Sequence, residues 1–151
     1  MRKTIAACLC LAAILTGCKL QKTPAAFSIP DGEWSIIELM GEKLLPEATK
    51  QFLIFDAASR RLSGDAGCNR ISGNIEPGGG RGKNGIKFQG IVSTRKACLD
   101  MRLEDELLRA LDDAVRFDSE GRDGQAKIIV FYGTDNQRLF VISQTHLPEH
   151  F

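Results

Sequence analysis

The cysteines constrain this chain most, because only Cys68 and Cys98 of its five cysteines lie beyond residue 18. The start of the chain indicates export, and an even number of remaining cysteines in an oxidising compartment predicts a disulfide. Closing a loop of about thirty residues removes conformational entropy worth roughly 3.5 kcal/mol from the unfolded state. Two alternatives fit less well. A zinc site needs more ligands, and no histidine lies near either cysteine; redox-active pairs usually occur as Cys-X-X-Cys.

The first residues have the pattern of an export signal. Two basic residues precede an uncharged run over 4–15, which is shorter than the ~20 residues that a membrane span requires. The run ends in Leu15-Thr16-Gly17-Cys18, which resembles the bacterial lipobox, whose cysteine is lipidated and becomes the mature N-terminus. We therefore expect a lipoprotein signal peptide at 1–17 and a lipid anchor at Cys18. The alternatives are an ordinary signal peptide with an incidental cysteine and a cytosolic protein with an apolar start.

Behind the anchor the chain has room for one small domain, since single domains most often span roughly 100–150 residues. Residues 18–30 combine the lipidated cysteine with a proline-containing stretch that lacks periodicity, which predicts a flexible tether. We place the folded domain at 31–145 and a C-terminal tail at 146–151. Lys19 stands where aspartate retains many lipoproteins at the inner membrane. The predicted location is therefore the cell envelope, at the outer membrane and facing the periplasm or the cell surface.

The charge of the chain argues against one class of partner. Loss of the two basic residues of the signal would change the formal net charge from +1 to −1. No basic surface is implied, so we expect no nucleic-acid partner. The expected partners are the membrane, through Cys18, and a protein or an apolar ligand. We expect no cofactor and no metal site, and a monomeric state.

Short runs of β-branched and aromatic residues, separated by turns, predict an antiparallel sheet. A helix is predicted only at 101–115, where apolar residues recur at helical spacing. The predicted fold class is α+β, mainly an antiparallel β-sheet curled into a roll or open barrel with one packed α-helix. The predicted strands cover residues 34–39, 51–55, 61–64, 70–75, 86–88, 127–132 and 138–142.

The charged residues of the predicted helix are typical of a solvated surface. Asp100 precedes the helix and is suited to be its N-cap. Asp105 precedes Arg109, and Asp112 precedes Arg116, by one helical repeat, which predicts two surface ion pairs. No function is implied by this charged face.

The loop over 76–85 contains the spacing Gly-x-Gly-x-x-Gly at Gly80, Gly82 and Gly85. In dinucleotide-binding folds this motif joins a strand to the N-terminus of a helix that receives the pyrophosphate. Here a β-prone run follows, so we reject dinucleotide binding and predict a mobile hairpin loop. A phosphate-binding P-loop is rejected as well, because Pro77 occupies the position of its first glycine.

The middle of the chain carries three motifs that resemble a known family. They are Gly64-Asp-Ala-Gly-Cys-Asn-Arg70, Thr94-Arg-Lys-Ala-Cys98 and Glu104-Asp-Glu-Leu107, and a tryptophan, Trp34, lies near the start of the predicted domain. This pattern resembles the META domain of HslJ-like bacterial proteins over about residues 34–142. The resemblance implies a small α+β fold that is frequent on envelope lipoproteins and is linked in its named member to heat shock and drug tolerance. It implies no enzyme activity.

Three residues of these motifs, Asn69, Arg70 and Arg95, are candidates for binding. The disulfide would draw the two arginines toward one patch, where a carboxylate, a phosphate or an acidic partner could be held. The plainer interpretation is structural. The arginines would then pair with helix acids such as Glu104 or Glu106, and Asn69 would hydrogen-bond the backbone of its own turn. The glycines around Cys68 would serve turns or close backbone contacts.

The sequence contains no recognisable catalytic motif. Both histidines, His146 and His150, lie in the predicted tail, and no serine has a Gly-x-Ser-x-Gly environment. We therefore expect a non-catalytic envelope lipoprotein with a binding or stress-tolerance role, in heat shock or in resistance to apolar antibiotics. The alternatives are a small secreted hydrolase with an unrecognised site and an inhibitor of a secreted enzyme.

Overall fold

Two β-meanders, joined by one strand, make up the sheet of this protein. The computed structural model describes residues 29, 31–120 and 128–144. Within these residues the strand order is β6-β5-β4-β3-β1-β9-β8-β7, with β2 paired to β1, and all pairs are antiparallel. The strands are β1 (Gly32–Leu39), β2 (Glu42–Lys43), β3 (Phe52–Asp56), β4 (Arg61–Asp65), β5 (Arg70–Pro77), β6 (Ile86–Ser93), β7 (Arg116–Glu120), β8 (Ile128–Tyr132) and β9 (Arg138–Ser143), and the helices are α1 (Pro46–Thr49) and α2 (Arg102–Asp113).

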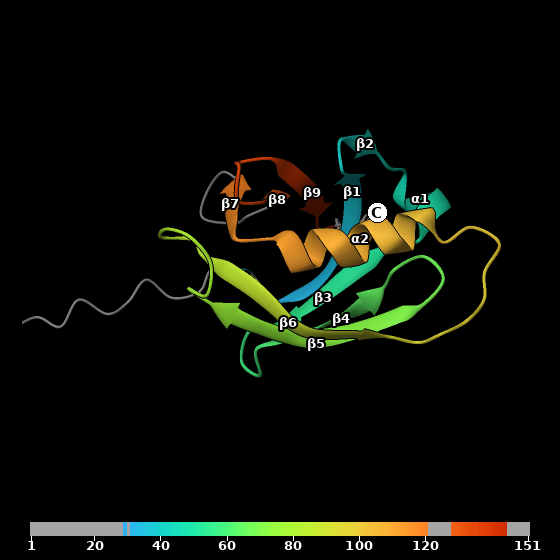
Figure 1. Ribbon diagram of the computed structural model, residues 1–151, viewed down its shortest axis with the longest axis horizontal. Helices are drawn as coiled ribbons and strands as arrows, with labels where there is room; N and C mark the ends of the chain where they lie inside the picture. Colours follow the sequence, from blue (N-terminus) through green and yellow to red (C-terminus); the bar gives the residue numbers. More distant parts are fainter. Residues whose placement is uncertain (1–28, 30, 121–127, 145–151) are drawn as a thin grey trace, which may run out of the picture.

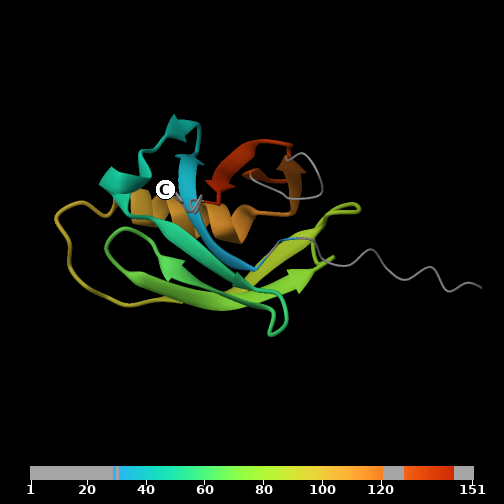
Figure 2. The same cartoon turned by 180° about the vertical axis from the view of Figure 1, so that it is seen from behind.

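The sheet curls until its two edge strands, β6 and β7, meet near one end (Figure 1). There Gly85 and Arg116 form an isolated antiparallel bridge. The Ile86 N–H donates to the Val115 carbonyl at 3.2 Å. Seen from behind, β1 and β3 cross in front of α2, which therefore lies inside the curl (Figure 2). The predicted α+β roll with a packed helix is confirmed.

Aromatic rings fill the interior of this curl. The ring centroid of Phe131 lies 4.3 Å from that of Phe140, 5.7 Å from Phe88, 6.0 Å from Phe117 and 6.3 Å from Phe55. These separations suit favourable ring pairs. The apolar stripe of α2 packs against the same cluster. Side chains of the described residues therefore fill the interior of the curl. An apolar ligand could enter it only by displacing them.

The first turn of α2 begins later than the predicted helix. Arg102 is the first helical residue and Met101 is the N-cap, while the Asp100 side chain accepts the Arg102 N–H at 2.9 Å. The Arg102 guanidinium binds Glu42 of β2 at 2.9 Å and Glu106 at 3.3 Å. Its hydrogen bonds to Glu42, and then those to Glu106, raise the pKa of Arg102 above its ordinary value. This cluster connects the start of the helix to the sheet.

The two ion pairs predicted along α2 are not formed. Arg116 already belongs to β7, where its guanidinium binds Asp118 at 2.6 Å rather than Asp112. Arg109 donates from Nε to the backbone carbonyl of Asp105 at 3.1 Å rather than to its carboxylate. The helix ends before Arg116 although neither glycine nor proline lies between helix and strand, so no local signal marks this boundary.

Two segments that were predicted to be loose pack against the domain. Ile29, inside the predicted tether, is buried in the hydrophobic core. In the glycine-rich loop, the Arg81 N–H donates to the Val115 carbonyl at 2.8 Å, and a Cβ on Gly80 would lie 1.7 Å from that oxygen. The predicted hairpin is confirmed by the antiparallel pairing of β5 with β6. Its loop also closes the roll and needs a glycine at the contact, which the sequence did not indicate.

The predicted signal peptide at 1–17, the anchor Cys18 and the tail at 146–151 lie outside the described residues. Neither helix of the described part is long and apolar enough to cross a bilayer. Export and lipidation therefore stay predictions.

Truncation of Phe131 should leave a cavity at the centre of the core, since its ring contacts four others. We expect Phe131→Ala to lower the free energy of unfolding by about 3–5 kcal/mol. Urea denaturation followed by circular dichroism measures the change. Leu99→Ala is the control, because Leu99 is fully exposed and its loss should change stability by no more than about 0.5 kcal/mol. Equal effects of the two substitutions would contradict this description of the core.

Candidate functional site

Three segments meet at one end of the sheet, and the first of them is distant in the sequence from the other two. They are the β4–β5 turn at 66–69, the segment 94–98 that follows β6, and the first turn of α2. Cys68 and Cys98 join the first two through a disulfide, with Cα atoms 6.4 Å apart, as predicted. Gly67 has a φ of +107°, a conformation that L side chains rarely adopt, so the turn before the cysteine requires glycine.

The buried side chain of Asn69, which belongs to the β4–β5 turn, bonds to the other two segments. Its Oδ1 accepts hydrogen bonds from Thr94 Oγ1 at 2.8 Å and from the Lys96 N–H at 2.7 Å. Its Nδ2 donates to the Lys96 carbonyl at 3.3 Å and to the two carboxylate oxygens of Glu104 at 2.9 and 3.1 Å. Both polar atoms of the amide are thus satisfied, as burial demands. The bonds run to other segments and not, as predicted, to the backbone of its own turn.

The main partner of Asn69 is a buried acidic residue. Glu104 lies in the first turn of α2 and is only 4% exposed. It accepts a further hydrogen bond from the Asn69 N–H at 3.0 Å. A buried carboxylate costs free energy unless donors satisfy it. The donors of Asn69 therefore allow Glu104 to be buried. The motif that contains Asn69 and the motif that begins at Glu104 thus depend on each other.

The two candidate arginines lie near each other in the backbone, because Arg70 exchanges hydrogen bonds with Thr94, the residue before Arg95, but only one of them lines a groove. Arg95 lines a groove between β6 and α2, whereas Arg70 lies exposed on β5 and is not among the groove residues. In the part of the chain that the structure describes, neither guanidinium forms an ion pair. The predicted pairing with helix acids is wrong, because Glu104 accepts from Asn69 and Glu106 binds the first residue of α2.

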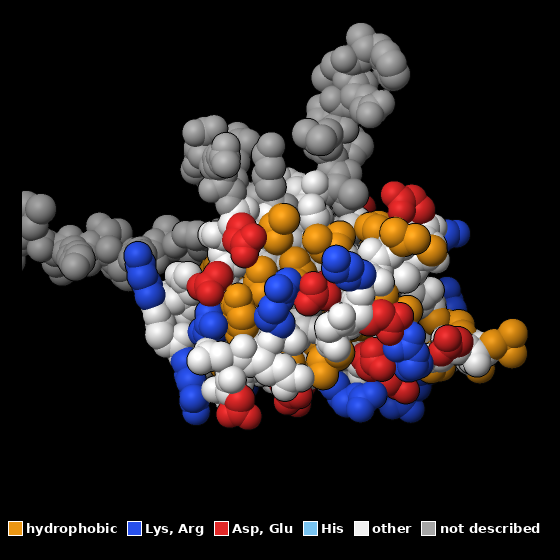
Figure 3. Space-filling model, turned by 90° about the horizontal axis from the view of Figure 1, so that it is seen from above, with side chains coloured by type: hydrophobic (Ala, Val, Ile, Leu, Met, Phe, Trp, Pro, Cys, Tyr) orange, Lys and Arg blue, Asp and Glu red, His pale blue; other side chains and the backbone are white. Residues whose placement is uncertain are grey.

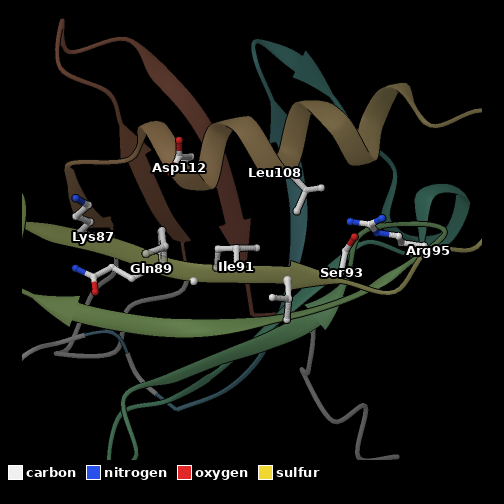
Figure 4. Close-up of a pocket in the computed structure, with 10 residues that line it drawn as sticks. Lys87, Gln89, Ile91, Ser93, Arg95, Leu108 and Asp112 are labelled. Atoms are coloured by element: carbon white, nitrogen blue, oxygen red, sulfur yellow. The ribbon is translucent and has the colours of Figure 1, made fainter.

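The groove beside Arg95 has a volume of about 780 Å³. Its floor is β6 from Lys87 to Ser93, and α2 contributes Leu108 and Asp112. Figure 4 shows Lys87 toward one end and Arg95 toward the other, with Leu108 pointing from α2 toward β6. The volume lies within the roughly 300–1,000 Å³ of typical ligand clefts.

Arg95 is held in place from both sides. Its neighbours Thr94 and Lys96 are both bonded to Asn69, and Cys98 is tied to the β4–β5 turn. These contacts position the backbone of Arg95, and among the described residues its guanidinium has no ion-pair partner, so it can bind another group. Asn69 therefore acts in this site as a positioning residue.

The charges of the groove are uneven along its length. On the face seen in Figure 3, basic and acidic side chains are interspersed without an extended area of one sign. The groove carries Lys87, Arg95 and Asp112. Asp112 lies toward the Lys87 end in Figure 4, so the Arg95 end is cationic. An anionic group would be stabilised there.

The motifs, the disulfide and this geometry agree with a comparison against protein families. The family model of the META domain matches residues 27–145. This protein belongs to the META domain family. The match includes the groove and all residues of the Asn69 contacts.

Solved structures share the fold of this META domain at low identity. An NMR structure of a protein from Burkholderia xenovorans matches with a TM-score of 0.60 and 21% identity, covering 97% of this chain and 100% of that chain. A crystal structure of a DUF4847 family protein from Bacteroides vulgatus matches with a TM-score of 0.55 and 13% identity, covering 75% and 92%. A comparison with curated proteins finds no match. At these identities the similarity shows the fold alone.

Sequence reasoning identified only part of the groove of the META domain. Arg95 was a candidate, but Lys87, Leu108 and Asp112 were not. Asp112 had been interpreted as half of a surface ion pair and Lys87 as an ordinary strand residue. The groove forms where the edge of β6 faces α2, and no motif in the sequence predicts that these two elements pack in this way.

The groove of the META domain offers groups suited to binding. Cationic, carboxylate, amide and hydroxyl side chains line it beside apolar ones. Among the described residues, no group of three His, Cys, Asp or Glu side chains is placed to hold a metal ion. His146 and His150 lie outside the described residues.

Replacement of Asn69 should loosen the contacts between the three motifs of the META domain and leave the buried Glu104 with only the backbone N–H of residue 69 as a donor from this position. We expect Asn69→Ala to lower the free energy of unfolding by about 3 kcal/mol. Adding Glu104→Gln to this variant removes the buried carboxylate and should recover more than about 1 kcal/mol. Chemical denaturation of the oxidised proteins measures both changes. If the double variant is no more stable than Asn69→Ala, the buried carboxylate is not the cause of the loss.

Proposed function

We propose that this protein is a non-catalytic, lipid-anchored envelope protein whose META domain binds a partner in the groove between α2 and β6. The observation that carries the proposal is the position of Arg95. Its backbone is fixed on both sides, while its guanidinium faces a groove and has no acidic partner among the described residues. An unpaired arginine on a fixed backbone is suited to recognition, because only its side chain, and not the segment that carries it, has to be ordered on binding.

The envelope location is supported by the N-terminal sequence. The lipobox-like ending at Cys18 and the disulfide both suit a protein that is exported and then tethered to a membrane. We further propose that binding in the groove contributes to tolerance of heat and of apolar antibiotics. A tethered domain with its groove exposed could engage envelope proteins close to the membrane.

A second candidate, an inhibitor of a secreted enzyme, is favoured by the segment that the disulfide braces. Residues 94–100 are exposed, and Leu99 is fully so. Cys98 and the contacts of Asn69 hold this segment to the domain. A braced loop with a protruding apolar side chain is preorganised to enter an enzyme pocket.

Lipidation is tested by labelling cells with radioactive palmitate and separating membranes from soluble protein. We expect label and membrane association in the wild type, and loss of both in Cys18→Ser, because the acyl chains are attached at that sulfur. Cys10→Ser is the matched control and should behave as the wild type. Label in Cys18→Ser, or an unlabelled wild type, would contradict the anchor.

The role of the groove is tested by complementation of a gene deletion. We expect the deletion strain to survive heat and apolar antibiotics less well, and wild-type protein to restore survival. Arg95→Glu should fail to restore it, because the cationic end of the groove is reversed. Arg70→Glu is the control, since Arg70 is an exposed arginine outside the groove.

The outcome separates the candidates. Full restoration by Arg95→Glu would overturn the groove as the functional site. Loss of function in Leu99→Ala with restoration by Arg95→Glu would favour the inhibitor. An unaffected deletion strain would remove the stress component.

A further inference from the structure

The floor of the groove is a sheet edge. β6 is the last strand in the sheet order and pairs with β5 on one side only. Its first residue is bonded on the outer side, where the Ile86 N–H donates to the Val115 carbonyl. After this contact α2, rather than another strand, stands opposite β6. Within the part of the chain that the structure describes, the edge along the groove is therefore free of strand pairing.

The backbone of Phe88 points into the groove. Phe88 is paired with Ile75 of β5, but the Ile75 N–H donates at 2.8 Å to the Arg60 carbonyl on the other side of β5. The two residues therefore form a non-hydrogen-bonded pair, in which the N–H and C=O groups face away from the partner strand. Ile86 lies two residues before Phe88 and donates its N–H on the outer side of β6. Because the direction of the backbone groups alternates along a strand, those of Phe88 also point outward.

The backbone of Ser93 points the same way at the other end. The Thr94 N–H donates to the Arg70 carbonyl at 3.0 Å, so Thr94 faces β5. Because successive residues of a strand direct their backbone groups to opposite sides, Ser93 faces the groove. Backbone donors and acceptors thus line the groove at two places along its length, and an edge of this kind is a template for another extended chain.

From this edge, and resting on the proposed function, we infer that the groove takes up an extended peptide of about five to seven residues as an additional strand beside β6, with an acidic side chain of the peptide against Arg95. Main-chain hydrogen bonds to β6 would supply affinity, and alternate side chains would supply specificity. Leu108 and Ile91 provide the apolar contact between the two charged ends of the groove.

The shape and charge of the groove favour a peptide over a second copy of this chain. A second copy would have to bring its own α2 to the same edge together with its β6, whereas a peptide adds a single strand to the groove. The register shift between β5 and β6 and the charged Lys87 also discourage self-pairing of the edge. The cationic Arg95 end complements an acidic residue of a partner.

The test uses a phage library of random heptapeptides, selected on the oxidised protein and followed by calorimetry with the best synthetic peptide. We expect sequences in which apolar and polar residues alternate and an Asp or Glu recurs at one position. Arg95→Glu should weaken binding of this peptide about tenfold or more, and Arg70→Glu, the matched control, less than twofold. N-methylation of alternate peptide amides should also weaken it about tenfold, because it removes the donors to β6. Amide resonances of Phe88 and Ser93 should shift in NMR spectra.

Each other outcome overturns the inference. No enriched sequence, or enriched peptides that bind equally well after N-methylation or to Arg95→Glu, would exclude strand addition at this edge. Dimerisation seen by light scattering and abolished by Ser93→Pro, which removes an outward-facing N–H without touching the core, would assign the edge to a second copy. If strand addition fails while Arg95→Glu still fails to complement the deletion, the groove keeps its function and binds a different ligand.

Discussion

The amide of Asn69 joins the β4–β5 turn to two later parts of the chain, the segment after β6 and the first turn of α2, and the rest of the site depends on this contact. Its oxygen holds the segment after β6, and its nitrogen holds both that segment and the first turn of α2. A buried carboxylate at Glu104 is acceptable only because Asn69 supplies donors to it. The helix is thereby tied to the end of the sheet near the disulfide.

The disulfide and the Asn69 contacts act on different states of the protein. The bond between Cys68 and Cys98 stabilises chiefly by restricting the unfolded chain. The contacts of Asn69 exist only in the folded state and determine where Arg95 lies. At the other end of β6, the bridge between Gly85 and Arg116 closes the roll. Between these two fixed ends β6 is unpaired on its outer edge within the described part of the chain, and the proposed binding in the groove rests on this edge.

Much of the fold could be predicted from local patterns. Alternation in strands such as 70–75 and the helical spacing of α2 report burial directly, and the disulfide follows from the cysteine count. β7 was missed because it follows the helix without a glycine or proline. The bond between Asn69 and Glu104 spans 35 positions, and a buried pair at such a separation leaves no periodic signal. Arg95 could be named as a candidate from its motif, whereas the groove beside it exists only after strand and helix have packed.

Amide hydrogen exchange of the segment after β6, measured by NMR on the oxidised protein, tests this account most directly. The Lys96 amide donates to a buried acceptor and should exchange at least ~100-fold more slowly than the amide of the exposed Ala97 beside it, and protection should be lost in Asn69→Ala. If Lys96 exchanges as fast as Ala97 in the wild type, Asn69 does not hold the segment and the position of Arg95 is not fixed as described.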